Sequence, residues 1–198
     1  PFCNFTTSPR FVRTNAEGAN RTIVDPTRSG INEKIDKDRP FHCASIDEVA
    51  TAAEHLGQGV IMIKFDIISA YNKIRQAASD YIFSMESDEE GFYLKMRHQW
   101  GNSAAGFCFF DFADAFAMIL RSFLLLILLF FVDDFILLVP ADRFGRPNWR
   151  RATLVAKLVN IVAVFLNVGL AKWGAGTLIT FLGIRISTTK MRYWIPVV

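Results

Sequence analysis

Three aspartates stand where apolar segments end, and their positions suggest metal-dependent chemistry. Asp133 and Asp134 are adjacent and lie between two apolar runs, Leu124 to Val132 and Phe135 to Val139. Asp66 follows a third apolar run. Burying an unpaired carboxylate costs several kcal/mol or forces it to take up a proton. Adjacent buried aspartates therefore need a metal, a cationic partner or a turn that is open to water.

Two structures fit the paired aspartates. A strand, a two-residue turn that carries both of them and a returning strand would place Asp133 and Asp134 at the tip of a hairpin facing a cleft. An ordinary buried hairpin fits equally, because Asp is a common turn residue. Asp66 has the same ambiguity, since it could be a ligand at the end of a strand or the cap of the next helix. Together the three carboxylates could hold two Mg²⁺ ions about 3.5 to 4 Å apart, which is the chemistry of phosphoryl transfer.

The remaining elements follow from periodicity and from the placement of glycine and proline. Ser45 and Glu48 match the capping-box pattern, which predicts a helix that ends at Gly57. Apolar periodicity predicts the other segments: a strand at Val60–Phe65, a hairpin of Tyr81–Met85 with Gly91–Met96, a loop at Gln99–Gly106, helices at Phe107–Leu120 and Trp149–Val168, and a last hairpin of Leu178–Ile186 with Met191–Ile195.

Composition bounds the class of protein. The chain has 198 residues, of which 52% are apolar, so it needs a large core and is not disordered. With 22 basic and 19 acidic residues, the charge permits a nucleic-acid partner without requiring one. The spacing of cysteines and histidines does not match a zinc site. Because the chain begins at Pro1 and has an odd number of cysteines, we expect a piece of a longer polypeptide in a reducing compartment.

One apolar run, Phe123 to Val139, approaches the length of a membrane span. It contains Asp133 and Asp134, each of which costs about 2.5 to 3.5 kcal/mol at the centre of an inserted helix. We therefore expect no stable membrane association, and a membrane-inserted protein is kept as an alternative.

Several segments resemble the motifs of reverse transcriptases. Phe131-Val132-Asp133-Asp134 is similar to the aromatic-x-Asp-Asp box of these enzymes, and Lys64 to Tyr71 is similar to their first catalytic-aspartate motif. Phe181-Leu182-Gly183-Ile184 resembles the hairpin box that supports the primer end. The resemblance extends from about Arg21 to Pro196. Four segments are most similar to retroelements of the DIRS type: Arg21–Asp25, Ser45–Glu48, Phe112–Ala115 and Phe181–Met191.

The resemblance implies catalytic and metal-binding roles. Asp66 and Asp133 would be the principal metal ligands, with Asp134 beside them, and the cofactors would be two Mg²⁺ ions, with Mn²⁺ as a substitute. Phe181, Leu182 and Gly183 would support the primer.

It also implies a nucleotide site. Tyr71 would be the aromatic gate that rejects a 2′-hydroxyl, although an ordinary buried aromatic fits the position too. Arg21 would neutralise the triphosphate, and Gln99 and Gly101 would lie in the loop beneath the nucleotide and the template base. Lys172 would protonate the leaving pyrophosphate, or it is a solvated lysine.

The implied fold is α+β. It is a polymerase palm, an antiparallel sheet backed by helices with a ferredoxin-like core, together with partial fingers. The expected boundaries are partial fingers at 1–60, the palm strand and helix with the first catalytic aspartate at 61–80, the fingers hairpin and nucleotide loop at 81–106, and the palm with its terminal primer-supporting hairpin at 107–198.

The implied function is that of an RNA-directed DNA polymerase domain of a retroelement, a nucleotidyltransferase that adds dNTPs to a primer 3′-hydroxyl. Its partners would be an RNA or DNA template with primer, dNTPs and other domains of a longer polyprotein, in the cytoplasm or nucleus. One alternative is a catalytically decayed remnant that binds nucleic acid. Another is an RNA-templated RNA polymerase, against which Tyr71 argues, because such an enzyme must accept the 2′-hydroxyl.

Overall fold

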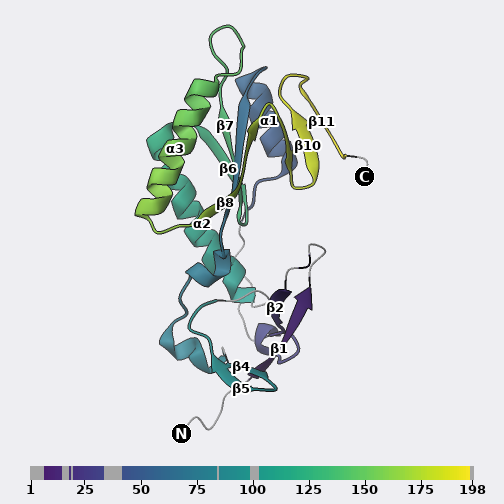
Figure 1. The fold of residues 1–198 in the computed structure, drawn as a ribbon, viewed down its shortest axis with the longest axis vertical. Coiled ribbons are helices and arrows are strands. Elements are labelled where there is room, and N and C mark those ends of the chain that lie inside the picture. The colour runs from purple at the N-terminus through teal and green to yellow at the C-terminus, as the bar shows by residue number, and fades with distance from the viewer. Residues whose placement is uncertain are drawn as a thin grey trace. The chain divides into compact units, whose positions relative to one another are not determined.

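The computed structural model describes residues 7–14, 18, 20–33, 42–83, 85–98 and 103–196, and the chain forms two compact units (Figure 1). The first unit comprises Pro1–Phe41 with Ser69–Asp111, and the second comprises His42–Ile68 with Phe112–Val198. Each unit therefore combines two separate stretches of chain. The functional division into fingers and palm at residues 60, 80 and 106 stays a prediction.

The first unit is built on a four-stranded sheet of order β2-β1-β4-β5, in which β1 and β4 are parallel and the other pairs antiparallel. Its elements are β1 (Thr7–Thr14), β2 (Asn20–Val24), β4 (Met85–Asp88), β5 (Gly91–Leu94) and the 3₁₀ helices η1 (Ile31–Glu33), η2 (Ala70–Lys73) and η3 (Ala78–Phe83). The predicted strand Tyr81–Met85 is wrong, because Tyr81 to Phe83 belong to η3 and, of the described residues in this range, Met85 alone is in a strand. Over so few residues, apolar alternation does not separate a strand from a short helix.

The second unit contains the antiparallel sheet that carries the aspartates. Its order is β6 (Ile127–Phe131), β7 (Asp134–Val139), β3 (Ile61–Ile67) and β8 (Leu170–Gly176). The two central strands, β7 and β3, are almost entirely buried, as expected for strands covered on both faces. Strand β8 was not predicted, because its four small residues and its lysine lack the pattern of a buried strand.

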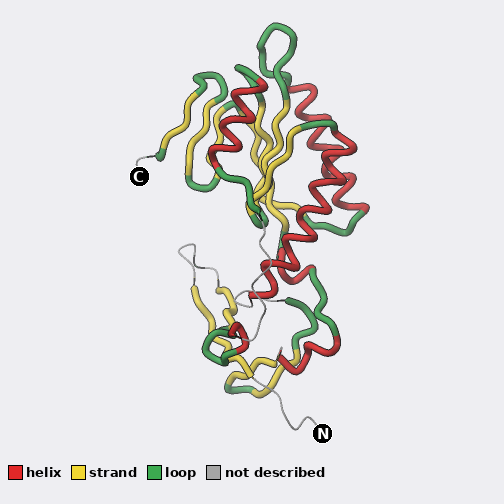
Figure 2. Tube along the Cα trace, turned by 180° about the vertical axis from the view of Figure 1, so that it is seen from behind, coloured by secondary structure: helices red, strands yellow, loops and turns green. Residues whose placement is uncertain are grey.

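Both faces of this sheet are covered (Figures 1 and 2). One face carries α3 (Trp149–Phe165) and the part of α2 (Ser103–Leu124) from Phe112 onward, whose Phe116 ring meets Phe135 edge-on at 5.7 Å. The other face carries α1 (Ile46–Leu56) and a three-stranded sheet of β9 (Leu178–Phe181), β10 (Ile184–Ser187) and β11 (Arg192–Trp194). The predicted α+β class, with an antiparallel sheet backed by helices, is confirmed.

The C-terminal segment makes two hairpins instead of the predicted one. Leu178–Ile186 is not a single strand, because Leu182 and Gly183 form a turn that pairs Phe181 with Ile184. Both turn residues have positive φ, 48° and 80°, as in the two-residue turns that suit the twist of a hairpin. Leucine is unusual at such a φ, so the sequence did not reveal the turn.

The apolar run Phe123–Val139, considered above as a membrane span, is not a continuous helix. It comprises the end of α2, strand β6 and strand β7, separated by turns. Leu125, with φ of 51°, ends α2, and the Arg121 guanidinium donates two hydrogen bonds of 3.0 and 2.8 Å to the Leu128 carbonyl. Of the helices that the structure describes, only α2 is long and apolar enough to span a membrane, a property that buried core helices share.

Helix α2 also begins earlier than predicted. Ser103 to Gly106, expected to be part of a loop, form its first turn, and the backbone N–H of Ser103 donates to the Asn32 side chain at 2.9 Å. The rest of the predicted nucleotide loop, including Gln99 and Gly101, lies outside the described residues.

Candidate active site

Strand pairing brings two of the three aspartates together. Asp66 in β3 and Asp134 in β7 are directly opposite each other in the antiparallel register. Phe65 and Phe135 pair at the next position and their rings stack at 5.3 Å. A shift of one residue would move each of these side chains to the wrong face of the sheet, so the stacked rings hold the aspartates in place.

The third aspartate, Asp133, lies on the turn between β6 and β7. The turn residues are Val132 and Asp133, because Phe131 pairs with Asp134. The prediction that both aspartates occupy the turn is therefore wrong: Asp134 is the first residue of β7. Its carboxylate consequently lies on the sheet beside Asp66, and the Asp133 backbone carbonyl accepts a hydrogen bond of 3.2 Å from the Ile67 N–H.

Val132 has a strained backbone. Its φ of 56° is left-handed, a conformation that is an outlier for a β-branched residue. Such strain costs on the order of 1–3 kcal/mol and is typical of functional sites. Here it accompanies a turn that holds one aspartate beside the paired two.

Lys172 reaches the aspartates through a β-bulge in β8. Lys64 pairs with Gly174 and Asp66 pairs with Ala171, so Lys172 and Trp173 together oppose the single residue Phe65. The Trp173 ring packs on Phe65 at 5.1 Å, whereas Lys172, with φ of 50°, directs its Nζ to Oδ2 of Asp66. The bulge therefore places a cation on the buried carboxylate.

A second lysine lies on the same face. Lys64 precedes Asp66 by two residues, so their side chains project from the same side of β3. Its Nζ is 3.8 Å from Oδ1 of Asp134 and donates a hydrogen bond of 3.4 Å to the Thr180 carbonyl. Three carboxylates and two ammonium groups thus share one end of the sheet.

Two of the aspartates on this face, Asp133 and Asp134, resist ionisation. Burial, followed by hydrogen bonding and charge from the neighbouring Asp66, raises the pKa of Asp134 to about 6, against the opposing charge of Lys64. Burial also raises the pKa of Asp133, assisted by Asp66 and opposed by Lys172. Contact with Asp66 raises the pKa of Lys172, which stays protonated. Bringing three carboxylates together beside only two lysines therefore favours the protonated form of Asp133 and Asp134.

The residue types fit a divalent cation with oxygen ligands. Asp66 is only 5% exposed, and its Oδ1 is buried with no hydrogen-bond partner in the described structure. A buried acceptor without a partner costs free energy that a cation could recover. In the described part of the chain, however, no three Asp, Glu, His or Cys side chains are grouped to hold a metal ion as they stand. Binding at this face would therefore require side-chain movement, beginning with Lys172.

The other predicted site residues are distributed over both units. Tyr71 lies in η2 of the first unit, half-buried, with its ring 5.5 Å from that of Phe109. Arg21 lies in β2, where it is the register partner of Arg13 in β1.

In the second unit, the predicted primer-supporting residues form the end and the turn of the β9–β10 hairpin. Phe181 is fully buried there in a core with Val49, Met62 and Ile186. The Thr188 hydroxyl after β10 donates to the Val60 carbonyl at 2.6 Å, which ties this hairpin to the start of β3.

Sequence reasoning missed the role of Lys64. Its position two residues before Asp66 was the available signal, since alternate residues of a strand share a face. The contact of Lys172 with Asp66 could not be inferred in this way, because it depends on the bulge.

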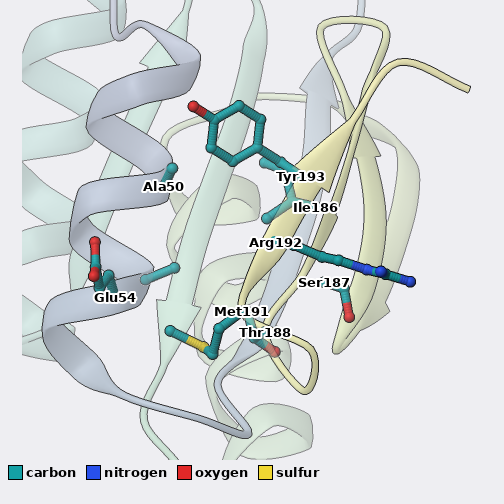
Figure 3. A pocket seen from close by; sticks show the side chains of 9 residues that line it. Ala50, Glu54, Ile186, Ser187, Thr188, Met191, Arg192 and Tyr193 are labelled. Carbon is teal, nitrogen blue, oxygen red and sulfur yellow. The ribbon is translucent and has the colours of Figure 1, made fainter.

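A groove of about 350 Å³ lies elsewhere in the second unit, between α1 and the β10–β11 hairpin. Figure 3 shows the Tyr193 hydroxyl directed toward α1 and Arg192 pointing away from it. The lining of the groove also includes Glu54, Met191 and Thr188. The Thr188 hydroxyl already donates its hydrogen bond to the Val60 carbonyl. None of the three aspartates lines this groove, and it adds no group to the candidate active site.

Comparison with solved structures identifies the fold. The foamy viral protease-reverse transcriptase dRH in complex with double-stranded DNA matches 92% of this chain with a TM-score of 0.70 and 14% identity, over 30% of its own chain. The foamy viral protease-reverse transcriptase with double-stranded DNA matches 96% with a TM-score of 0.68 and 11% identity, over 36% of its chain. The foamy viral protease-reverse transcriptase in complex with an RNA/DNA hybrid matches 92% of this chain with a TM-score of 0.63 and 13% identity, over 23% of its own chain.

These matches show the fold alone, which is like that of a reverse transcriptase. The chain spans roughly a quarter to a third of the length of the structures it matches. No family model and no curated protein matches the sequence. The expected resemblance to reverse transcriptases is therefore confirmed at the level of the fold.

Proposed function

We propose that this chain is the palm and part of the fingers of an RNA-directed DNA polymerase from a DIRS-type retroelement. The observation that carries the proposal is the register of β3 and β7. It sets Asp66 opposite Asp134, with Asp133 on the adjoining turn, in a chain with a reverse-transcriptase-like fold. The reaction is the transfer of a dNMP unit from a dNTP to a primer 3′-hydroxyl on an RNA or DNA template.

The three carboxylates are the proposed ligands of two Mg²⁺ ions. When bound, the ions would supply activation of the primer hydroxyl and charge stabilisation at the leaving pyrophosphate. Asp66 and Asp133 provide the principal oxygens, and Asp134 lies beside them. Lys172, whose side chain is 72% exposed, leaves Asp66 when the site fills and is available to donate a proton to the pyrophosphate.

The remaining predicted residues position the substrates. Arg21 binds the triphosphate, Tyr71 excludes a 2′-hydroxyl, and the loop with Gln99 and Gly101 lies beneath the nucleotide. The β9–β10 turn at Leu182 and Gly183 supports the primer end. We further propose that the chain works beside other domains of a polyprotein in the cytoplasm or nucleus.

Primer extension on an RNA template with Mg²⁺ tests the proposal. Asp133→Ala should lower the rate by on the order of 100-fold or more, since it removes a ligand of the ions that would stabilise charge at the reacting groups. The matched control is Asp47→Ala, which removes an exposed aspartate from α1 and should retain the rate. Equal rates for Asp133→Ala and the unsubstituted chain would overturn the assignment.

Sugar selectivity tests the gate separately. Tyr71→Ala should increase incorporation of ribonucleotides relative to deoxyribonucleotides, because the ring no longer occupies the space of the 2′-hydroxyl. An unchanged ratio would remove Tyr71 from the mechanism without affecting the assignment of the aspartates.

A second candidate function is a remnant that binds nucleic acid without turnover. The contact of Lys172 with Asp66, and the lack of a three-ligand group among the described residues, favour this candidate. It predicts binding of a primer–template duplex, no extension, and a melting temperature that does not respond to Mg²⁺. Extension above background contradicts it.

A further inference from the structure

Helix α3 is apolar on two opposite faces. Ala152, Val155, Val159 and Ala163 are buried against the sheet. On the opposite side, four large apolar residues are exposed: Leu154 by 57%, Leu158 by 39%, Ile161 by 63% and Phe165 by 87%. We call these four residues the outer stripe. A helix that is apolar all round is normally buried all round, and exposed apolar patches of this kind mark interaction sites.

The spacing of the outer stripe is that of a helix–helix seam. Its residues are separated by four, three and four positions, the alternation of three and four that the a and d positions of a coiled coil show. The arrangement is also symmetric about the midpoint between Val159 and Asn160. Two copies of α3 in antiparallel orientation would therefore set Leu154 opposite Phe165 and Leu158 opposite Ile161, twice each, as a two-fold interface requires.

The charges of α3 favour the antiparallel orientation. Its charged residues are Arg150, Arg151 and Lys157, and it has no acidic residue. In a parallel pair each cation would lie beside the same residue of the second helix, and the two like charges would repel each other. In an antiparallel pair Arg150 and Arg151 would lie near the last turn of the other helix, where unsatisfied carbonyls carry partial negative charge. The last turn of α3 contains no basic residue of its own.

A shallow hollow offers space for the paired residue. It has a volume of about 440 Å³ and is lined by Asn160, Ile161, Val164 and Phe165. In the antiparallel pair, Leu154 of the second copy lies next to Phe165, beside this hollow. Apolar side chains that enter hollows of the opposite surface provide most of the affinity of such interfaces.

We propose that the chain forms a two-fold dimer through the outer stripe, with the two α3 helices antiparallel. The partner is a second copy of this chain. The proposal is independent of the proposed polymerase activity, because none of the aspartates lies on α3.

Sedimentation of the 198-residue chain tests the dimer. Weak protein interfaces have dissociation constants in the micromolar range. At a chain concentration of about 50 µM, above that range, we expect a dimer. Leu158→Asp should weaken the dimer by at least about 10-fold, because it places a charge in the apolar seam. Thr153→Asp puts the same charge on an exposed position away from the stripe and should leave the dimer intact. Circular dichroism checks that both variants fold.

A monomeric unsubstituted chain overturns the proposal, whether the stripe is then open to water or covered by another domain of a longer protein. A dimer that persists unchanged in Leu158→Asp also overturns it.

Disulfide formation tests the orientation. With the native cysteines replaced by serine, a mixture of Leu154→Cys and Phe165→Cys chains should give the mixed disulfide, and Leu154→Cys alone should give none. In the antiparallel pair the two copies of position 154 are about 16 Å apart along the helix axis, beyond the roughly 7 Å limit for a disulfide. A disulfide dimer of Leu154→Cys alone would contradict the antiparallel arrangement.

Discussion

Replacement of Asp134 by asparagine should stabilise the metal-free protein at neutral pH. Asp134 shares the end of the sheet with Asp66 and Asp133, and its pKa is raised to about 6, first by burial and then by Asp66. Asparagine keeps the size of the side chain and provides an N–H donor toward Asp66, as the protonated carboxyl does. It therefore mimics the protonated form at every pH.

The sign of the pH dependence follows from the raised pKa. A carboxyl whose pKa is higher in the folded than in the unfolded protein binds its proton more tightly when folded. Between pH of about 4 and about 6, the free energy of unfolding should therefore fall as pH rises. Below this pH window the carboxyl is protonated in both the folded and the unfolded protein. Above it the carboxyl is ionised in both, and the free energy of unfolding falls no further.

The magnitude follows from the difference between the two pKa values. A change from 3.8 to about 6 corresponds to at most about 3 kcal/mol, at about 1.4 kcal/mol per pKa unit. The Asp134 side chain is 30% exposed, so water and salt screen much of this free energy. We expect Asp134→Asn to raise the free energy of unfolding by about 1 kcal/mol at pH 8, and by much less at pH 4.

Urea unfolding at both pH values, with a chelator present, measures the effect. Addition of Mg²⁺ at about 10 times its dissociation constant should stabilise the unsubstituted chain by about 1.4 kcal/mol through binding to the folded state. The gain should be smaller in Asp134→Asn, which lacks one ligand oxygen. If Asp134→Asn is no more stable than the unsubstituted chain at pH 8 without metal, the electrostatic account of this site is wrong.

Three further substitutions test other parts of the site and its support. In urea unfolding without metal, Lys172→Met should lower the free energy of unfolding by about 1–2 kcal/mol, because it removes the cation that contacts the buried Asp66 carboxylate. Mg²⁺ should restore part of this loss. The control Lys190→Met, at an exposed position, should change the free energy of unfolding little. Val132→Asn should raise stability by about 0.5–1 kcal/mol in the same assay, since Asn tolerates the left-handed φ of 56°; a loss would show that Val132 is not strained. Gly59→Ala should lower the melting temperature by the equivalent of about 2 kcal/mol, because its Cβ would lie 2.5 Å from the carbonyl oxygen of Gly145 at a φ of 81°, and an unchanged melting temperature would contradict this close approach.

Local signals in the sequence were sufficient for several elements. The capping box of Ser45 and Glu48 predicted α1, and the structure shows both of its hydrogen bonds and Gly57 at its end. The apolar run before Asp66 predicted β3, and the apolar runs around Asp133 predicted β6 and β7. These signals are local because they depend on neighbouring residues and on backbone periodicity.

Elements whose conformation depends on partners were missed or misplaced. Strand β8 has little apolar pattern of its own, and it is a strand because β3 offers it an open edge. Leu182 adopts a positive φ because the pairing of β9 with β10 requires a two-residue turn there. No local propensity favours either conformation, so the tertiary context decides.

The sequence by itself determined the residue types of the candidate site and the strands that carry them. Asp66, Asp133 and Asp134 stand at the ends of apolar runs, and burial of these runs brings carboxylates to the end of a sheet. Only the tertiary structure decided which of them face each other and which cations accompany them. The register between β3 and β7 pairs Asp66 with Asp134, and the bulge in β8 brings Lys172 onto Asp66. Both depend on contacts between strands that are far apart in the chain, where the stacking of Phe65 on Phe135 selects one register from many.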